Sequence, residues 1–320
     1  MDDKNLNREI KPLIKKRFYG HKRLYSKYLP RFPASAERDY FRLCRDYFGL
    51  MKECLEEELP TFKEVYRKTI NESKNVHHDS ADDLWNAITL MFNNISNKLQ
   101  KKIETFDLGR RLENIARATR KLTVREWRNA IHKTLGIDIR EDYYLGDFYQ
   151  EYLKQWSDQN VDLIKTIPYE MLDNMRQLIY DGYVKGTCTT DIAKQINRAY
   201  GTGMKHAMFI ARDQMSKLNS NLAQAQQRDA GVNHYRWQTC GDERVRESHR
   251  ALDRKVFSWD DPPETDGGRR CHPGEDYGCR CYPEPVFDLD EITLPVDWDS
   301  MSDKIGRNYT KNRGGMNGRT

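Results

Sequence analysis

The chain is 320 residues long, with 32% charged and 38% hydrophobic residues, and its 54 basic and 49 acidic side chains leave a formal net charge of +5. A chain of this length buries a sizeable core and divides into two or three parts. The near balance of charge gives no global electrostatic reason to bind nucleic acid. No stretch approaches the roughly 20 apolar residues of a membrane helix, and residues 1–18 have no signal-peptide pattern, so we expect a protein made in the cytoplasm without a membrane partner.

Residues 8–28 form a basic segment that carries four aromatic rings, Phe18, Tyr19, Tyr25 and Tyr28. Cations that contact phosphates and rings that stack on bases would suit nucleic acid. The same composition is typical of a solvated helix face whose rings pack on a neighbouring element, and we favour this interpretation. An arm that docks onto an acidic partner protein would have the same composition.

Helical periodicity begins after this segment. Between residues 37 and 70 a predicted helix carries apolar residues at steps of three and four, namely Tyr40, Leu43, Tyr47, Leu50, Met51 and Cys54. Pro60 is expected to end this helix or to begin another. Cys44 and Cys54 are predicted to be small buried hydrophobic residues.

A second long helix is predicted from Ser80, which forms an N-cap pair with Asp83. The preceding pair, His77 and His78, is not expected to share a metal ion, because adjacent residues do not face one another on a helix. The predicted buried stripe of this helix consists of Leu84, Ile88, Met91, Phe92, Ile95, Leu99 and Ile103.

The middle of the chain contains further helix signals. Thr123 and Glu126 have the spacing of a capping box, so a short helix is predicted to start there and to stop at Gly136. Its buried face is predicted at Trp127, Ile131 and Leu135. Further helices are predicted over residues 168–182, 189–200 and 204–229, because glycine commonly follows the C-terminal end of a helix. Arg212 in the last of these is interpreted as one half of an intramolecular ion pair, with Asp242 or Glu243 as partner.

Residues 237–287 differ from the rest of the chain. They contain Cys240, Cys271, Cys279 and Cys281 together with His249 and His272, and they are rich in proline and glycine. Such a segment has too little apolar material to be held together by burial alone, whereas thiolate and imidazole are preferred ligands of tetrahedral zinc. Alternating residues predict strands at 235–239 and 255–257. The expected fold class is therefore mainly α, with helical N-terminal and middle regions followed by a small, zinc-stapled α+β module and a disordered basic tail.

The predicted zinc ligands are His249, Cys271, Cys279 and Cys281, with Cys240 and His272 as competitors. Two cysteines separated by one residue reach a single ion only if the chain bends, and Gly278 before them and prolines after them suit a bend. Four protein ligands would close the shell, which indicates a structural metal with no catalytic residues. The alternative is a disulfide pair with free thiols and surface histidines, which the absence of an export signal disfavours.

The same segment carries a resemblance. The resemblance lies in the runs WQTCGDERVRESHRALD, FSWDDPP and CHPGEDYGCRCYPEPV. Three shorter runs upstream belong to it as well, namely LIKTIP from Leu163, IARDQ from Ile210 and KLN from Lys217. Together these runs resemble the phage head-morphogenesis family, whose members are similar to protein F of phage Mu. The resemblance covers roughly the second half of the chain and none of the first 150 residues. In this family we expect a small residue where Cys240 stands, which makes Cys240 the weakest candidate ligand.

The resemblance implies a minor capsid protein present in few copies in the virion, inside the phage head. It would act in head assembly, and in DNA packaging or ejection, by binding rather than by catalysis. Its implied partners are the portal protein and the major capsid or scaffolding protein. Packaged DNA is a further candidate partner for the basic tail, although a solubilising tail would have the same composition. The competing prediction is a metal-dependent nuclease or an ADP-ribosyltransferase-like enzyme that acts on nucleic acid or host protein.

The predicted organisation has four parts. Residues 1–150 form an N-terminal helical region and residues 151–235 the helical part of the head-morphogenesis-like domain. Residues 236–290 form the Cys/His-rich module. Residues 291–320 form a flexible basic tail, because Lys304, Arg307, Lys311, Arg313 and Arg319 follow Asp303 without a further acidic residue.

Overall fold

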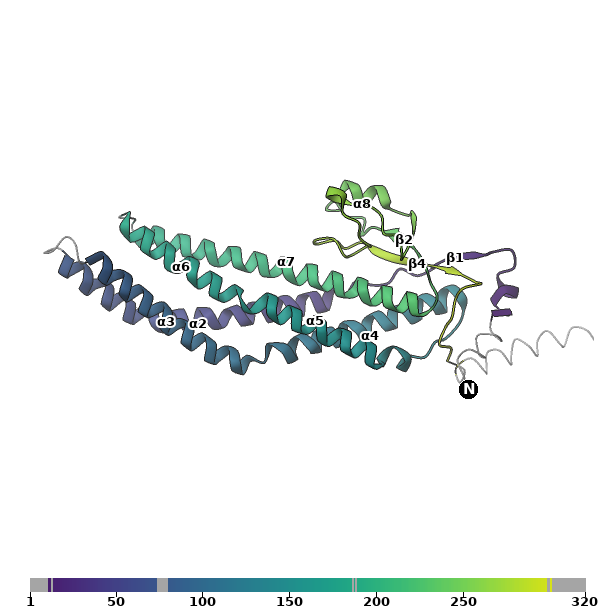
Figure 1. Ribbon diagram of the computed structural model, residues 1–320, viewed down its shortest axis with the longest axis horizontal. Helices are drawn as coiled ribbons and strands as arrows, with labels where there is room; N and C mark the ends of the chain where they lie inside the picture. Colours follow the sequence, from purple (N-terminus) through teal and green to yellow (C-terminus); the bar gives the residue numbers. More distant parts are fainter. Residues whose placement is uncertain are drawn as a thin grey trace, which may run out of the picture. The chain divides into compact units, whose positions relative to one another are not determined.

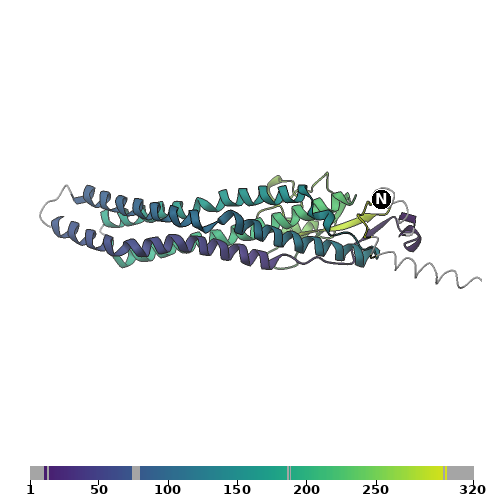
Figure 2. The same ribbon diagram turned by 90° about the horizontal axis from the view of Figure 1, so that it is seen from below.

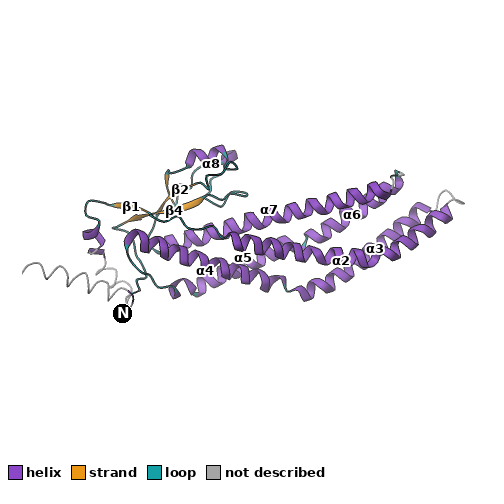
Figure 3. Cartoon of the chain, turned by 180° about the vertical axis from the view of Figure 1, so that it is seen from behind, coloured by secondary structure: helices purple, strands orange, loops and turns teal. Residues whose placement is uncertain are grey.

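The computed structural model describes residues 11–297 except 13, 74–79, 186 and 188, together with residue 300. Helices dominate it, as predicted, and strands are few (Figure 3). The helices are α2 (Ala34–Ser73), α3 (Ser80–Phe106), α4 (Leu108–Leu135), α5 (Asp147–Lys165), α6 (Ile167–Val184), α7 (Thr189–Asp229) and α8 (Glu247–Leu252), with short 3-10 turns η1 (Asp142–Leu145) and η2 (Asp266–Gly268). The strands are β1 (Arg23–Tyr25), β2 (His234–Gln238), β3 (Val256–Ser258) and β4 (Tyr282–Asp288).

Contacts divide the described chain into two compact units. Unit 1 draws on residues 1–34, 117–152 and 215–320, and unit 2 on residues 35–116 and 153–214. The boundaries fall at the start of α2 and within α4, α5 and α7, so each unit is assembled from segments that are distant in the sequence. The four-part division predicted from the sequence runs along the chain and stays a prediction. None of the described helices combines the length with the apolar run that crossing a bilayer requires.

In unit 2, α2 and α3 lie side by side as antiparallel neighbours (Figure 2). Most residues of the predicted stripes are buried, at Tyr40, Leu43, Tyr47, Met51 and Cys54 in α2 and at Ile88, Met91, Phe92, Ile95 and Leu99 in α3. The predicted members Leu50 and Ile103 are half-buried, and the side chain of Leu84 lies outside the described residues. Lys102 bridges Glu53 and Glu57 at 2.9 and 3.0 Å, which ties the solvated edges of the two helices together. Cys44 and Cys54 are fully buried, which confirms that they are core residues.

Two predicted helix breaks are wrong. α2 continues through Pro60 to Ser73, so proline neither ends nor restarts it. A proline costs one hydrogen bond of the helix, but the buried stripe from Tyr40 to Cys54 packs α2 before it, and such packing outweighs a cost of this size. Likewise α7 is a single helix across Gly201 and Gly203. A Cβ at Gly203 would stand 2.5 Å from Sδ of Met171, so this glycine permits close packing of α6 against α7 rather than a stop.

The predicted capping box is also wrong, because Thr123 and Glu126 lie inside α4. The Thr123 hydroxyl donates to the backbone oxygen of Thr119 at 3.0 Å, as serine and threonine do within a helix. Glu126 instead accepts hydrogen bonds from the Tyr28 hydroxyl and from the Arg31 amide. The other parts of the prediction are confirmed: Trp127, Ile131 and Leu135 are buried, and Gly136 follows the helix end with a φ of 73°.

Unit 1 contains a four-stranded antiparallel sheet in the order β1-β4-β2-β3. Purple β1 and yellow β4 lie side by side in Figure 1, so the sheet joins segments from the two ends of the described chain. β2 and β3 confirm the predicted strands, whereas β1 and β4 were missed. The sheet, α8 and the loops between them form the α+β module that the sequence predicted.

β4 is a central strand even though it contains Pro283 and Pro285. Proline usually argues against a central strand because it has no N–H for the ladder. Here the Pro285 oxygen accepts from the Ser26 amide, and the Pro283 oxygen accepts from the Gln227 side chain at 2.9 Å. In an antiparallel strand a residue's N–H and C=O point the same way, so both missing donors face away from β2 and its ladder stays intact.

The sheet is anchored to α4 and stiffened across its strands. The rings of Trp127 on α4 and Phe287 on β4 stack with centroids 5.9 Å apart. Arg236 on β2 forms a bidentate pair with the buried carboxylate of Glu284 on β4, at 2.7 and 2.8 Å. These contacts fix the register of β4, which carries the chain out of the Cys/His-rich loop.

Several sequence predictions lie outside the described residues. These concern His77, His78, the side chains of Ser80 and Asp83, the first part of the basic arm and the basic residues from Lys304 onward. Within the described part of the arm, Tyr28 contacts a neighbouring element, since Lys133 lies 4.6 Å from its ring centroid, while Tyr19 is 91% exposed.

Candidate metal centre

The centre of the α+β module is a small aromatic core with two cysteines in it. Tyr235 and Trp237 point inward from β2 and pack with Trp259, Cys279 and Cys281, all of them buried. Strand alternation explains why the two rings share a face. His249 lies on α8 with its ring edge against Trp237, at a centroid distance of 5.3 Å. The core therefore brings an imidazole from α8 next to two thiols that precede β4.

Three potential metal ligands converge here: His249, Cys279 and Cys281, all buried. His249 Nδ1 lies 3.4 Å from the Cys279 sulfur and 3.6 Å from the Cys281 sulfur. A tetrahedral zinc ion with bonds of about 2.3 Å to sulfur and about 2.0 Å to nitrogen places its sulfur and nitrogen ligands about 3.5 Å apart. The observed separations match this geometry, so the donor set fits zinc.

The chain bends as the cysteine spacing requires. Gly278 has a φ of 61°, and the Cys279 amide closes a turn by donating to the Asp276 oxygen at 2.9 Å. The Cys281 amide donates to the Cys279 sulfur at 3.3 Å. The hydroxyl of Ser216 on α7 donates to the Cys279 oxygen and holds the turn from outside. The backbone thus presents both sulfurs to one side of the loop.

Asp276 supports the imidazole from the opposite side. Its Oδ2 lies 3.2 Å from Nε2 of His249, so the ring nitrogen that does not face the sulfurs is held by a carboxylate. The same carboxylate, nearly fully buried, is bonded by Arg246 at 3.2 Å, Arg269 at 2.8 Å and the Tyr277 amide at 2.8 Å. A carboxylate behind a ligating histidine is common in metal sites, because it fixes the tautomer and the ring orientation.

The electrostatics of the site favour an anionic sulfur. The hydrogen bond from Cys281, helped by His249 and the Cys281 amide, lowers the pKa of Cys279 to about 5 against the effect of burial. The neighbouring Cys279 thiolate and burial raise the pKa of Cys281. Burial lowers the pKa of His249, but its hydrogen bonds with Cys279 and Asp276 outweigh burial and leave that pKa raised. Metal ligation by these three residues requires both sulfurs and Nδ1 of His249 to be free of protons, so ion binding would release protons from the group.

The remaining sequence candidates stand outside this group. The Cys271 sulfur lies 3.2 Å from Oγ1 of Thr265. Cys240 is exposed, with its sulfur 3.5 Å from Oδ1 of Asp242. His272 is buried, with Nδ1 2.9 Å from the Tyr235 hydroxyl, and it packs on Trp259. Three of the four predicted ligands therefore meet, and Cys271 is not among the atoms that lie within 4.8 Å of one another.

The predicted partner of Arg212 is wrong. Arg212 pairs with Glu37 of α2 at 3.5 Å within unit 2, whereas Asp242 pairs with Arg280. Arg212 is thus part of an intramolecular ion pair, as interpreted, but with a residue far away in the sequence. No periodicity or spacing links positions 37 and 212, so no local pattern predicts this pair.

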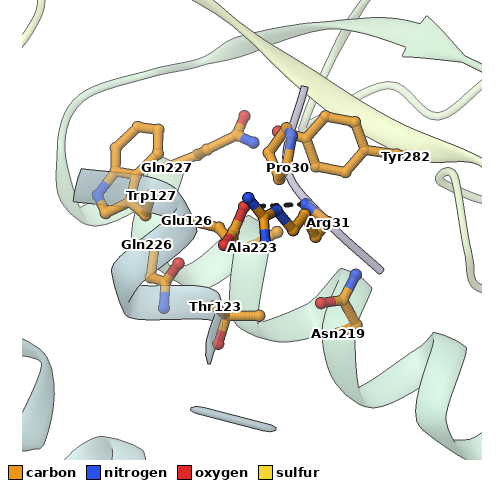
Figure 4. A pocket seen from close by; sticks show the side chains of 10 residues that line it. All are labelled: Pro30, Arg31, Thr123, Glu126, Trp127, Asn219, Ala223, Gln226, Gln227 and Tyr282. Atoms are coloured by element: carbon orange, nitrogen blue, oxygen red, sulfur yellow. Dashed lines mark hydrogen bonds between the residues drawn. The ribbon is translucent and has the colours of Figure 1, made fainter. Parts of the chain in front are cut away.

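A small cavity lined by both polar and apolar side chains lies between α4, α7 and β4 in unit 1 (Figure 4). Its lining includes Arg31, Glu126, Gln226 and Gln227, and the dashed line in Figure 4 marks the bond from the Arg31 amide to Glu126 at 3.0 Å. Nε2 of the buried Gln226 has no hydrogen-bond partner among the described residues. At ≈ 20 Å³ the cavity has room for about one water molecule, which makes it too small for a substrate.

Sequence reasoning missed the residues around the ligands. Asp276, Arg246 and Arg269 form one charged network behind His249, yet only cysteine and histidine were predicted as metal-site residues. A signal existed: Asp276 stands three residues before Cys279, and the Cys279 amide donates to its backbone oxygen in the turn that leads to the two cysteines.

Comparison with known proteins agrees with the resemblance seen in the motifs. Residues 173–283 match the family model described as phage Mu protein F like protein. A protein of Haemophilus influenzae (strain ATCC 51907 / DSM 11121 / KW20 / Rd), described as an uncharacterized protein, is 44% identical over 133 residues, which cover 41% of this chain and 29% of the relative. No solved structure matches. The matched stretch runs from α6 to the start of β4 and contains the whole candidate metal centre, so the similarity to the phage Mu protein F family predicted from the motifs is confirmed for residues 173–283.

Proposed function

We propose that this protein is a minor component of a phage head that acts in head assembly by binding other head proteins. The observation that carries the proposal is the family match over residues 173–283. The family match spans about a third of the chain, and the Haemophilus relative is matched over 29% of its own length. The role of the whole protein is therefore a proposal and is not taken over from these relatives.

In this proposal the protein lies inside the head in few copies and contacts the portal protein and the major capsid or scaffolding protein. A role in DNA packaging or ejection through the basic C-terminal residues belongs to the same proposal. The test is co-expression with the portal protein of the same phage, followed by affinity purification. We expect a stable complex whose formation survives nuclease treatment. A protein that leaves the portal unbound and is also absent from purified procapsids would contradict the assembly role.

We further propose that His249, Cys279 and Cys281 hold a structural zinc ion. The support is the match between the sulfur–nitrogen separations and a tetrahedral shell, together with the carboxylate behind the imidazole. Zinc supplies a cross-link there, joining α8 to the loop before β4, and the buried apolar core around it is small. We expect about one zinc per chain by elemental analysis, and its loss in Cys279→Ser/Cys281→Ser. The matched control is Cys44→Ser/Cys54→Ser, which alters two buried thiols outside the site and should keep the zinc.

One observation favours the enzymatic alternative: with Cys271 outside the group, three protein ligands would leave a position for water. Catalysis would also need a carboxylate free to accept a proton. Two carboxylates lie near His249, Asp266 and Asp276, and both are engaged. Asp266 pairs with Arg246 at 3.3 Å. Asp276 is bonded by the Tyr277 amide, Arg246 and Arg269, and these bonds hold the pKa of Asp276 below its usual value against the effect of burial. We therefore prefer the structural role. DNA cleavage or ADP-ribosyl transfer that disappears in Asp276→Asn would reverse this preference.

A further inference from the structure

Helices α6 and α7 of unit 2 form an open groove of ≈ 530 Å³. Ile167, Met171, Asn174, Leu178 and Asp181 of α6 follow one another along it at steps of three or four residues. Ala199, Thr202 and His206 of α7 line the other wall at the same steps. A third helix can pack between two stripes with this spacing, because the side chains of the third helix enter the holes between the side chains of α6 and α7.

The groove has a hydrophobic floor and an open top. Ile167 and Met171 are buried, Leu178 is half-buried, and Asn174 and Gln177 above them are exposed. Gly203 deepens the floor, because a side chain there would meet Met171. From Ile167 to Asp181 the groove is about 21 Å long at about 1.5 Å per residue, which corresponds to roughly four turns of a bound helix.

The charged residues of the groove indicate which kind of helix would bind in it. Glu170 and Asp181 stand near the two ends of the groove, and none of the residues that line it, all of them described, is lysine or arginine. Asp181 accepts a hydrogen bond from the amide of Gln177 at 2.8 Å, and a neutral amide does not cancel its charge. An apolar floor between two carboxylates is complementary to a helix with one apolar stripe and cationic flanks.

We propose that the α6–α7 groove is a docking site for a basic amphipathic helix of a partner protein. The bound helix would place leucine-like side chains over Met171 and Leu178 and a lysine or arginine near Glu170 and another near Asp181. This proposal rests on the groove alone and stands whether or not the partner is a head protein.

The test uses the full-length protein and two fluorescent peptides of about 15 residues in fluorescence anisotropy. Both peptides carry leucine at steps of three and four on an alanine background, and the flanking positions are lysine in one peptide and glutamate in the other. We expect the lysine peptide to bind and the glutamate peptide to bind at least about tenfold more weakly. In Glu170→Lys/Asp181→Lys the preference should reverse.

The control variant is Glu64→Lys/Asp158→Lys, which makes the same change of charge at exposed positions of unit 2 outside the groove. It should keep the preference of the unaltered protein, and circular dichroism should show that both variants fold. Equal binding of the two peptides, no binding of either, or an unchanged preference in Glu170→Lys/Asp181→Lys would overturn the proposal. So would self-association of the unaltered protein that Glu170→Lys/Asp181→Lys abolishes, since a second copy would then occupy the groove.

Discussion

The carboxylate of Asp276 lies 3.2 Å from Nε2 of His249, while the sulfurs of Cys279 and Cys281 lie at the other ring nitrogen. The imidazole is thus held on both sides, in a fixed orientation. Because Arg246 and Arg269 keep Asp276 in place, the orientation of His249 does not depend on a metal. A site organised in advance loses less conformational entropy when it binds an ion.

Asp276→Asn should weaken zinc binding about 10- to 100-fold. The neutral asparagine side chain would no longer make the imidazole of His249 a stronger metal ligand. It would also leave Arg246 and Arg269 without the anion that they share. Competition with a chromophoric chelator measures the affinity. The matched control is Glu264→Gln, an exposed carboxylate in the same loop, which should leave the affinity unchanged. Equal affinities for Asp276→Asn and the unaltered protein would show that the carboxylate does not support the site.

Cys271→Ser should lower zinc affinity less than Cys279→Ser does. The reason is that the Cys279 sulfur already faces His249, whereas the Cys271 sulfur faces Thr265 and must move to reach an ion. The same chelator competition on the two variants, at matched protein concentration, gives the comparison. If both variants lose zinc to the same degree, Cys271 is the fourth ligand and the shell is closed, as the sequence predicted.

The sequence anticipated the helical class, the strands β2 and β3, and three residues of the candidate site that the structure brings together. Its errors share a cause. Pro60, Gly201 and Gly203 were treated as local stop signals, whereas long buried stripes decide the extent of α2 and α7. β4 was missed because its prolines suggest an edge or a bend, and only the pairing on both sides reveals that their missing donors are not needed. The ion pair between Arg212 and Glu37 joins distant positions, which no local pattern predicts.

Thiol reactivity should separate the cysteines by burial. Among the cysteines that the structure describes, Cys240 is exposed and should react with iodoacetamide before the buried Cys44 in the folded protein. Its rate should rise about tenfold per pH unit below its pKa, because the thiolate is the nucleophile. Cys44 is fully buried, and burial raises its pKa to about 12, so it should react only on unfolding. Peptide mapping by mass spectrometry at pH 7 and pH 8 reads each site separately. Fast modification of Cys44 in the folded protein would show that the α2 core opens readily.

Two glycines of α7 offer a matched pair of substitutions. A Cβ at Gly201 meets nothing within 4 Å, so Gly201→Ala should stabilise the helix by up to about 1 kcal/mol through its higher helix propensity. A Cβ at Gly203 would stand 2.5 Å from Sδ of the buried Met171, so Gly203→Ala should be less stable than Gly201→Ala by about 1 kcal/mol or more.

Urea unfolding followed by circular dichroism measures both free energies, and the double variant Gly203→Ala/Met171→Ala separates the clash from other effects. If the clash is the cause, adding Gly203→Ala to Met171→Ala should cost little, because the methyl group then enters the space that Met171 has left. The comparison also bears on the α6–α7 groove, since Met171 forms its floor. Equal stability of the two single variants would mean that Met171 moves aside without cost, so that the floor of the groove is adaptable rather than fixed by Gly203.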